Sequence, residues 1–203
     1  MENKNADTDG GKIIGYENTA AGKEFVSVRK RLLSFTYCAL FAAFIAVCAW
    51  MTVPYTIPFT LQTFGIFSAA GILGGKRGTL AVFIYIMLGV VGLPVFSGFG
   101  SGIGYVVGAT GGYIVGFLFA AAVSGAMMKF IGYSFLPMFI SMMAGNLVCY
   151  AFGTAWYVAV YAGETSISAV LMMCVVPYII PDLIKIFLAA LLTARLKKYI
   201  AFN

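Results

Sequence analysis

The amino-acid sequence predicts an all-α integral membrane protein with six transmembrane helices. Of its 203 residues, 62% are hydrophobic and only 10% are charged, and the apolar residues are gathered in long runs. Soluble domains are usually about a quarter charged, so a soluble fold of this size could not cover so much apolar surface. The formal net charge is +6, but the basic residues form short clusters rather than a stripe with interleaved aromatics, which argues against nucleic acid as a partner. Membrane lipid is the expected surrounding.

The N-terminal residues are the most polar part of the chain. Residues 1–30 hold five of the seven acidic residues, and no apolar segment precedes residue 32. We therefore expect residues 1–28 to form a disordered cytoplasmic tail, with no cleavable signal peptide ahead of the first span. The six-helix transmembrane domain then covers residues 29–203.

Three apolar runs follow in the first half of the chain. The first, at about 32–52, has roughly 20 residues, which is enough to cross a hydrocarbon core of about 30 Å. Pro54 and Pro58 prevent this helix from continuing. The second run, at about 60–73, and the third, at about 79–93, are short for full spans, so we expect them to begin inside the protein rather than at the lipid boundary.

The second half contains a glycine-rich segment and three further runs. The segment 92–116 has nine glycines, too many for a regular helix over most of its length. Runs at about 110–131 and 135–161 predict the fourth and fifth spans. The sixth is expected at about 180–199, after a short apolar piece that Pro177 ends and that suits an interfacial or re-entrant segment.

Lysine and arginine occur only at alternate connections between these runs. The connections at about 53–59, 92–108 and 162–166 contain neither residue type. Apart from Lys185, the basic residues beyond the tail are Arg29, Lys30, Arg31, Lys76, Arg77, Lys129, Arg195, Lys197 and Lys198. By the positive-inside rule, both termini are cytoplasmic and the number of spans is even.

Asp182 and Lys185 are the only charged residues inside an apolar run. A three-residue spacing places them on one helix face. Asp182 precedes Arg195 by about 20 Å of helix, so the pair lies in the outer half of the membrane if Arg195 marks the inner boundary. Burying an ionisable group there costs about a few kcal/mol unless it is paired. The pair could lock neighbouring helices together, but contact with a polar ligand in a cavity near the outer face is favoured.

Two segments near the outer face carry further polar candidates. Thr60, Gln62 and Thr63 lie at the outer end of the second run, where they could either bond within the helix bundle or line the cavity. Phe96 and Ser97 belong to the glycine-rich loop. Irregular backbone at membrane depth is tolerated where it lines a cavity or is buried in protein, and a flexible outer loop is the alternative.

Two helices carry the remaining candidate contact residues. Asn146 and Tyr150, four residues apart on the fifth span, share a face, and Trp156 follows them; all three could line the cavity or serve only packing. Ala39 and Ala43 in the first span begin a stripe of small residues. Such a stripe packs against another helix, either within the chain or on a separate membrane subunit.

Several kinds of chemistry are disfavoured. The chain has no histidine, and its four cysteines form no Cys-x-x-Cys pair and lie in apolar stretches, so buried thiols are expected rather than a metal site or disulfides. It has neither a Walker sequence nor a Gly-x-Ser-x-Gly motif. Because Asp182 is the only carboxylate at membrane depth, no acid–base pair exists, and we predict no catalytic residue and no cofactor. The two halves also lack the repeat of many secondary transporters.

Four stretches, in this order along the chain, resemble one known family. They begin at Pro58, Gly89, Thr110 and Asp182 and have the sequences Pro-Phe-Thr-Leu-Gln-Thr-Phe, Gly-Val-Val-Gly-Leu-Pro-Val-Phe, Thr-Gly-Gly-Tyr-Ile-Val-Gly-Phe and Asp-Leu-Ile-Lys. Together they are similar to the BioY family, the biotin-specific substrate-binding (S) components of energy-coupling-factor (ECF) transporters. The resemblance extends over about residues 32–200.

The resemblance implies a six-helix bundle with a ligand cavity near the outer face, which takes up biotin across the bacterial cell membrane. It also implies assembly with a transmembrane coupling protein, met by Ala39 and Ala43, and with two ATPase subunits. An S component for another vitamin and a stand-alone secondary transporter are the alternatives.

Biotin has an apolar bicyclic core, a ureido group with two N–H donors and one acceptor, and a carboxylate tail. In the implied site, Asp182 accepts from ureido N–H groups, and Lys185 pairs with Asp182 or donates to a ligand oxygen. Neutral hydrogen bonds are expected from Thr60, Gln62 and Ser97. The aromatic walls are expected from Phe59, Phe96, Tyr113 and Tyr150, with Asn146 in the same cavity.

Overall fold

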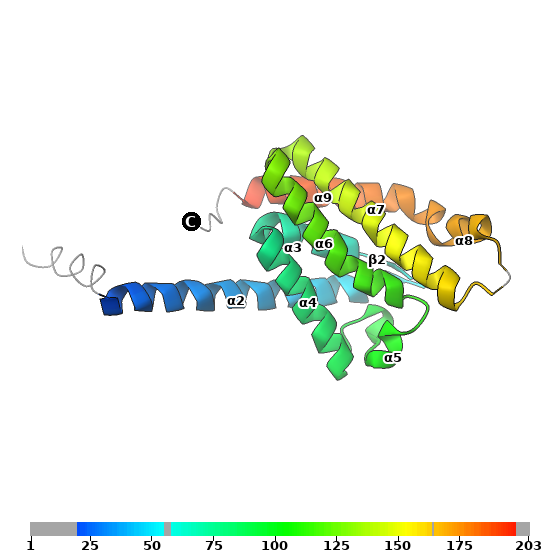
Figure 1. Cartoon of the computed structure of the whole chain (residues 1–203), viewed down its shortest axis with the longest axis horizontal. Helices are drawn as coiled ribbons and strands as arrows, with labels where there is room; N and C mark the ends of the chain where they lie inside the picture. Colours follow the sequence, from blue (N-terminus) through cyan, green and yellow to red (C-terminus); the bar gives the residue numbers. More distant parts are fainter. Residues whose placement is uncertain (1–19, 55–57, 164, 198–203) are drawn as a thin grey trace, which may run out of the picture. The chain divides into compact units, whose positions relative to one another are not determined.

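The structure of the protein is a computed structural model that describes residues 20–54, 58–163 and 165–197 (Figure 1). The chain divides into two compact units, residues 1–37 and residues 38–203.

Helix α2 (Ala20–Trp50) begins earlier than the sequence predicts. Residues 20–28 were assigned to a disordered tail but are helical, and the rest of the predicted tail lies outside the described residues. These residues include alanine, lysine and glutamate, which have high helix propensity. A helix also extends readily once the apolar run beyond has nucleated it.

The second unit is built mainly from helices (Figure 1). After the end of α2 come five long helices: α3 (Gln62–Leu73), α4 (Gly75–Val91), α6 (Gly111–Ile131), α7 (Phe135–Val160) and α9 (Val176–Leu196). The connections contain the short elements η1 (Ser97–Phe99), α5 (Ile103–Val106) and α8 (Ile167–Cys174). Helices α6 and α7 confirm the predicted fourth and fifth runs almost to the residue.

Four stretches of the described chain are apolar and long enough to cross a bilayer: Ser27–Trp50, Gly111–Ile131, Phe135–Val160 and Ile167–Leu196. The protein is therefore a multi-pass membrane protein. Helices α3 and α4 have 12 and 17 residues, or about 18 and 26 Å at the α-helical rise. Both helices are short, as the second and third runs predict; their start inside the protein and a total of six full spans stay predictions.

Helices α3 and α4 are joined by a single residue, Gly74, whose φ of 82° is accessible to glycine at little cost. The sequence places a longer turn at 74–78, but residues 75–78 belong to α4. Gly78 lies so close to α3 that a β-carbon there would be 2.5 Å from the Cα of Ala70. The turn is short because glycine lets the two backbones meet directly.

Helix α9 begins at Val176, four residues before the predicted start at 180. Pro177 lies in its first turn, where a missing N–H costs nothing, so the residue expected to end one helix instead starts another. Pro181 lies inside α9, next to Asp182, and removes one intrahelical hydrogen bond there. The predicted end at 199 lies outside the described part of the chain.

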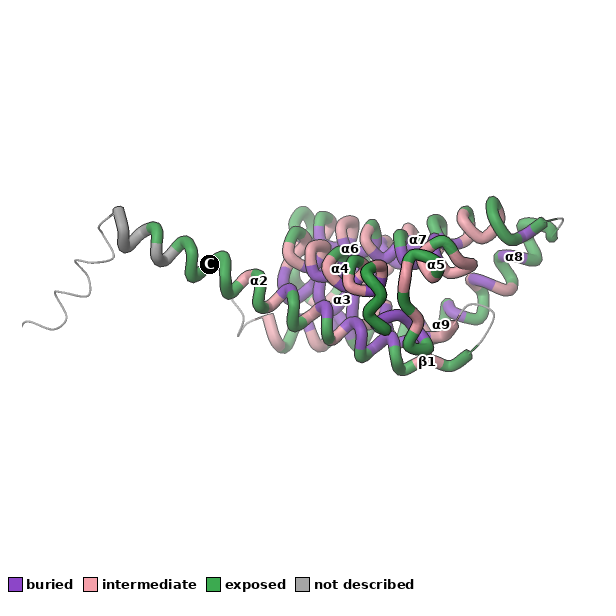
Figure 2. The backbone as a smooth tube through the Cα atoms, turned by 90° about the horizontal axis from the view of Figure 1, so that it is seen from below, coloured by how far each residue is buried: buried purple, intermediate pink, exposed green. Residues whose placement is uncertain are grey.

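Small residues allow the helices of the second unit to approach one another around a buried core. Gly125 of α6 lies against Gly75 of α4, and Gly145 of α7 lies against the Ser124 hydroxyl of α6. Phe67 is among the largest fully buried side chains. Figure 2 shows buried backbone inside the group formed by α3, α4 and α6, with exposed residues toward its outside.

A two-stranded ribbon leads from α2 into α3. Strands β1 (Thr52–Val53) and β2 (Phe59–Thr60) are antiparallel, and Thr52 pairs with Thr60. The backbone N–H of Leu61 also donates to the carbonyl oxygen of Cys48 over 3.2 Å. These bonds fix the polar residues that precede and begin α3.

Candidate ligand-binding site

A cavity lies among α3, α6, α7 and α9, beside the loop that carries η1 and α5. It contains about 620 Å³ of space not filled by protein atoms, part of it open to solvent. The cavity brings together eight of the ten predicted ligand-binding residues: Thr60, Gln62, Ser97, Tyr113, Asn146, Tyr150, Asp182 and Lys185.

Asp182 and Lys185 form an ion pair on one face of α9, as their spacing predicts. Lys185 Nζ lies 2.5 Å from Asp182 Oδ1. Lys185 is only 5% exposed and Asp182 only 4%. Two charges removed from water in this way need further hydrogen bonds to offset the desolvation cost. The surrounding helices supply them.

Asp182 accepts hydrogen bonds from two neighbouring helices. Tyr150 OH of α7 donates to Oδ2, and Thr63 Oγ1 of α3 donates to Oδ1 over 3.3 Å. Hydrogen bonds to an ionised group are stronger than neutral ones. The carboxylate is therefore held in one orientation by groups from α3, α7 and α9.

Lys185 connects α9 to strand β2. Its Nζ donates to the carbonyl oxygen of Thr60 over 2.9 Å and lies 4.5 Å from the centre of the Phe59 ring. The negative face of an aromatic ring attracts a cation. Phe59 also stacks on Tyr178, with ring centres 6.4 Å apart, and is not among the cavity-lining residues. It supports Lys185 rather than forming the predicted cavity wall.

Thr60 and Gln62 form a hydrogen-bonded chain that ends on Tyr85 of α4. Thr60 Oγ1 donates to Gln62 Oε1 over 2.8 Å, and Gln62 Nε2 donates to Tyr85 OH over 2.7 Å. The backbone N–H of Gln62 donates to Thr60 Oγ1 over 3.3 Å. Thr60 and Gln62 were expected either to bond within the helix bundle or to line the cavity. They do both, because the same side chains make these bonds and line the cavity.

The glycine-rich loop brings Ser97 and Tyr105 to the cavity. Ser97 Oγ bonds to Tyr105 OH, which donates to the Ser97 carbonyl oxygen over 2.9 Å. Phe96 is fully buried and does not line the cavity, contrary to the prediction. Its ring stacks on Tyr105 and meets the edge of Tyr85. It fills the space left by Gly89, where a β-carbon would lie 2.1 Å from the ring.

Asn146 carries an unused acceptor at the cavity. It is 6% exposed, and its Oδ1 has no hydrogen-bond partner within the described protein. Leaving a buried polar group unpaired costs about 1–3 kcal/mol, so a donor from a bound molecule would be favourable here. Unlike Asn146 Oδ1, the hydroxyl group of Tyr113 has a protein partner, because it donates to the Cys174 carbonyl oxygen over 3.3 Å. Trp156 does not line the cavity, and its Nε1 donates to the Gly108 carbonyl oxygen.

The alanine stripe of α2 divides into two faces. Ala42 and Ala46 are buried in the core, whereas Ala39 and Ala43 are exposed beside Leu40, which is 61% exposed. Packing within the chain therefore uses the first pair. The second pair is left for lipid or for another subunit.

Some cavity residues escaped the sequence analysis. Tyr178 lines the cavity and precedes Asp182 by one helical turn, a spacing that could have identified it. Cys149 and Cys174 also line it. All four cysteines are buried and free, as expected.

The arrangement suits binding rather than bond breaking. Its carboxylate is already bonded to Lys185, Tyr150 and Thr63, and no second carboxylate lines the cavity. Within the described ranges, no cluster of histidine, cysteine or acidic residues could hold a metal ion. What the site offers is a charged acceptor, a neutral acceptor, a cationic donor and aromatic walls. These groups fit a small, polar, largely uncharged molecule with N–H and carbonyl groups.

Comparison with known proteins adds independent information. The model of the BioY family matches residues 19–202. A protein of Thermotoga maritima described as biotin transporter BioY is 42% identical over 160 residues, which cover 78% of this chain and 92% of the relative. Biotin transporter BioY2 of Lactococcus lactis is 33% identical over 162 residues, covering 79% of this chain and 88% of that protein.

A solved structure has the same fold. The crystal structure of the S-component for biotin from an ECF-type ABC transporter superposes with a TM-score of 0.77 and 27% sequence identity. The alignment covers 84% of this chain and 93% of that one.

Proposed function

The chain belongs to the BioY family, and we propose that it is the biotin-binding S component of an ECF transporter, a subunit for biotin uptake rather than an enzyme. The observation that carries the proposal is the Asp182–Lys185 ion pair, buried beside a cavity that polar and aromatic side chains line in a membrane protein. Ionisable residues at membrane depth are costly and usually functional. Biotin is the proposed ligand because the matching relatives are described as biotin transporters.

The site residues match the chemistry of biotin. Asp182 accepts from one ureido N–H, and the unpaired Oδ1 of Asn146 accepts from another donor of the ligand. Lys185 donates to a ligand oxygen without leaving Asp182. Tyr113 and Tyr150 flank the apolar rings, while Thr60, Gln62 and Ser97 supply neutral hydrogen bonds at the rim. In a site with little water, each unmatched group penalises a wrong ligand.

We further propose six spans, formed by α2, α3, α4, α6, α7 and α9 within residues 29–203. The α3–α4 turn, the α6–α7 turn and the end of α9 lie at one end of the second unit (Figure 1). That end carries Lys76, Lys129 and Arg195, which supports a cytoplasmic position for it. Both termini are proposed to be cytoplasmic because Arg29, Lys30 and Arg31 precede the first span and Lys197 and Lys198 follow the last one. The cavity then faces the outside of the bacterial cell membrane.

The proposed partners are a transmembrane coupling protein and two ATPase subunits. The exposed Ala39 and Ala43 of α2 support a helix–helix contact with the coupling protein, because small side chains let membrane helices approach closely. No segment of this chain matches a nucleotide-binding motif, so in the proposed complex ATP is hydrolysed by the two ATPase subunits.

Equilibrium binding of the purified protein to a panel of vitamins tests the ligand. Saturable binding of biotin, with other vitamins at least about a hundredfold weaker, is the expected result, and selective binding of another vitamin would overturn the assignment. Proteoliposomes containing this chain alone should bind biotin without accumulating it. Accumulation driven by an ion gradient would instead identify a stand-alone secondary transporter.

A further inference from the structure

We propose that a second site, a groove between the α3–α4 turn and the C-terminal part of α6, holds the headgroup of an anionic phospholipid. The groove is separate from the ligand cavity and shares none of its lining residues. It contains about 1,410 Å³ of space not filled by protein atoms, much of it open. Lys76, Arg77 and Lys129 line it together with Phe130 and Tyr133.

Lys76 and Lys129 have no carboxylate partner among the described residues of the second unit. Between residues 38 and 203 the sequence has only two acidic residues, Glu164 and Asp182. Asp182, the only carboxylate among the described residues of this unit, is already paired with Lys185 in the ligand cavity. Lys76 and Lys129 are therefore available to an anion from outside the described part of this unit.

Two lysines lie beside a close contact between α4 and α6. Gly75 and Gly125 lie with their backbones in contact, and a β-carbon on Gly125 would be 2.1 Å from the Cα of Gly75. Helix α4 starts at this point, and no side chain caps its first N–H groups. Lys76 in that first turn and Lys129 in the last turn of α6 add two full charges beside them.

A further lysine lies at the rim. Lys197 Nζ lies over the ring of Tyr133, which lines the groove. Burial lowers the pKa of Lys197 to about 8, so this side chain is still mostly protonated at pH 7. The end of α9 thus adds to the positive potential of the same groove.

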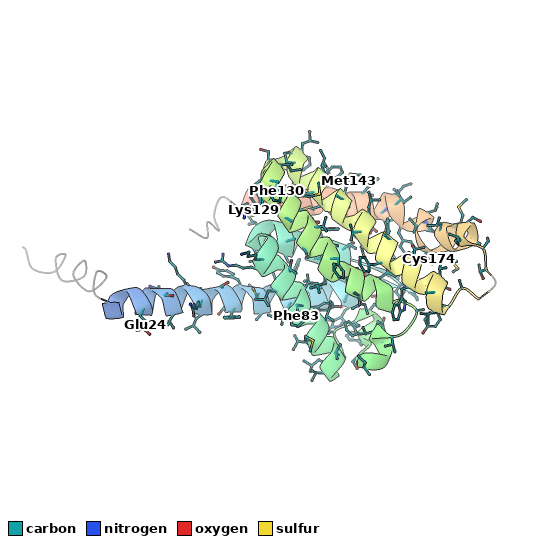
Figure 3. The ribbon with its side chains drawn as sticks, in the orientation of Figure 1. Glu24, Phe83, Lys129, Phe130, Met143 and Cys174 are labelled. Carbon is teal, nitrogen blue, oxygen red and sulfur yellow. The ribbon has the colours of Figure 1, made fainter. Side chains whose placement is uncertain are left out.

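The apolar residues of the groove favour a lipid over a soluble anion. Phe130 follows Lys129 and is 84% exposed, and Figure 3 shows both on the last turn of α6. Leu73, Ala122 and Ala126 also line the groove. A phospholipid presents a phosphate next to acyl chains, which matches cations next to an apolar surface. Basic pockets between transmembrane helices are a known setting for anionic lipid headgroups.

The test uses the full-length protein in neutral detergent, titrated with phosphatidylglycerol or phosphatidylcholine, with bound lipid counted by native mass spectrometry. We expect preferential binding of phosphatidylglycerol. The double variant Lys76→Gln/Lys129→Gln should weaken it about fivefold for each lysine removed. Lys76→Arg/Lys129→Arg should retain it, and Arg195→Gln, a charge near the same end that does not line the groove, should leave it unchanged.

Phe130→Ala separates a lipid from a free phosphate. It should weaken phosphatidylglycerol binding, because acyl contact is lost, and leave any competition by inorganic phosphate unaltered. Equal binding of the two lipids, or an equal loss in the double variant and in Arg195→Gln, would overturn the proposal. Equal binding of the two lipids would instead indicate that the groove binds an acidic protein segment. Equal losses in the two variants would indicate that the positive charges attract the lipid without a defined site. Thermal unfolding of each variant without lipid checks that the fold is intact.

Discussion

Tyr150 of α7 and Lys185 of α9 bind opposite oxygens of the same buried carboxylate, that of Asp182. Thr63 adds a third bond from α3. The ion pair is consequently part of how three helices are held together and also part of the wall that a ligand meets. This double role separates the expected effects of substitutions on binding from those on stability.

Asp182→Asn should weaken biotin binding at least about tenfold, which corresponds to the roughly 1.4 kcal/mol of one charge-assisted hydrogen bond. The amide keeps the shape of the side chain but replaces one acceptor oxygen with an NH₂ donor. This donor cannot accept a hydrogen bond from the ureido N–H groups. Isothermal titration of the purified variant measures the change. Glu24→Gln, which makes the same chemical change at an exposed position of α2, should bind biotin normally. Unchanged affinity in Asp182→Asn would remove Asp182 from the site.

The prominence of Asp182 and Lys185 in the sequence has a simple physical cause. Charges inside an apolar run are rare, so their position is informative, and their contact follows from helix geometry alone. Phe96 shows the opposite situation. The chain has 18 phenylalanines, and whether one faces a cavity or the core depends on distant residues. Here Gly89 leaves room for the ring of Phe96, a relationship that no local pattern predicts.

Helix boundaries near proline and glycine show the same dependence on context. Pro177 can end one helix or start the next, and in the structure it lies in the first turn of α9. The close contact between Gly78 and Ala70 allows the single-residue turn at Gly74. The helices at 110–131 and 135–161 could be predicted without knowing what they pack against, because the length and apolar character of these runs are enough to identify a membrane span.

Removing one member of the ion pair should cost more stability than removing both. Lys185→Met leaves a buried carboxylate without its cation and should destabilise the fold by about 3–5 kcal/mol. The double variant Asp182→Asn/Lys185→Met no longer buries a net charge, so we expect it to unfold at a temperature closer to that of the wild type. Thermal unfolding of the wild type, both single variants and the double variant gives the coupling energy. Additive effects of the two single changes would contradict a mutually dependent pair.

Asn146→Leu should affect binding without harming the fold. The Oδ1 of Asn146 has no protein partner in the described structure, so removing it breaks no internal bond at that atom. If the ligand supplies the missing donor, the variant should lose about 1–1.5 kcal/mol of binding free energy, or five- to tenfold in affinity. Its unfolding temperature should stay within about 2 °C of the wild type, because ΔΔG below about 0.5 kcal/mol shifts the midpoint little.

Ser68→Ala provides the matched control for Asn146→Leu. The Ser68 hydroxyl is also buried and unpaired, but Ser68 does not line the cavity. Its removal should leave biotin affinity unchanged. A loss of affinity as large as that of Asn146→Leu would mean that both effects arise from general packing rather than from a bond to the ligand.

Gly153→Ala should impair the cavity through Tyr113. A β-carbon at this position of α7 would lie 2.2 Å from the Tyr113 ring, which lines the cavity and donates to the Cys174 carbonyl oxygen. The ring must move, and overpacking of this kind costs about 1–3 kcal/mol. We expect both a lower unfolding temperature and weaker biotin binding. Gly104→Ala in α5 is the control, because a β-carbon there meets nothing within 4 Å and alanine favours a helix. If the two variants bound biotin equally well, the position of the Tyr113 ring would not matter for the ligand.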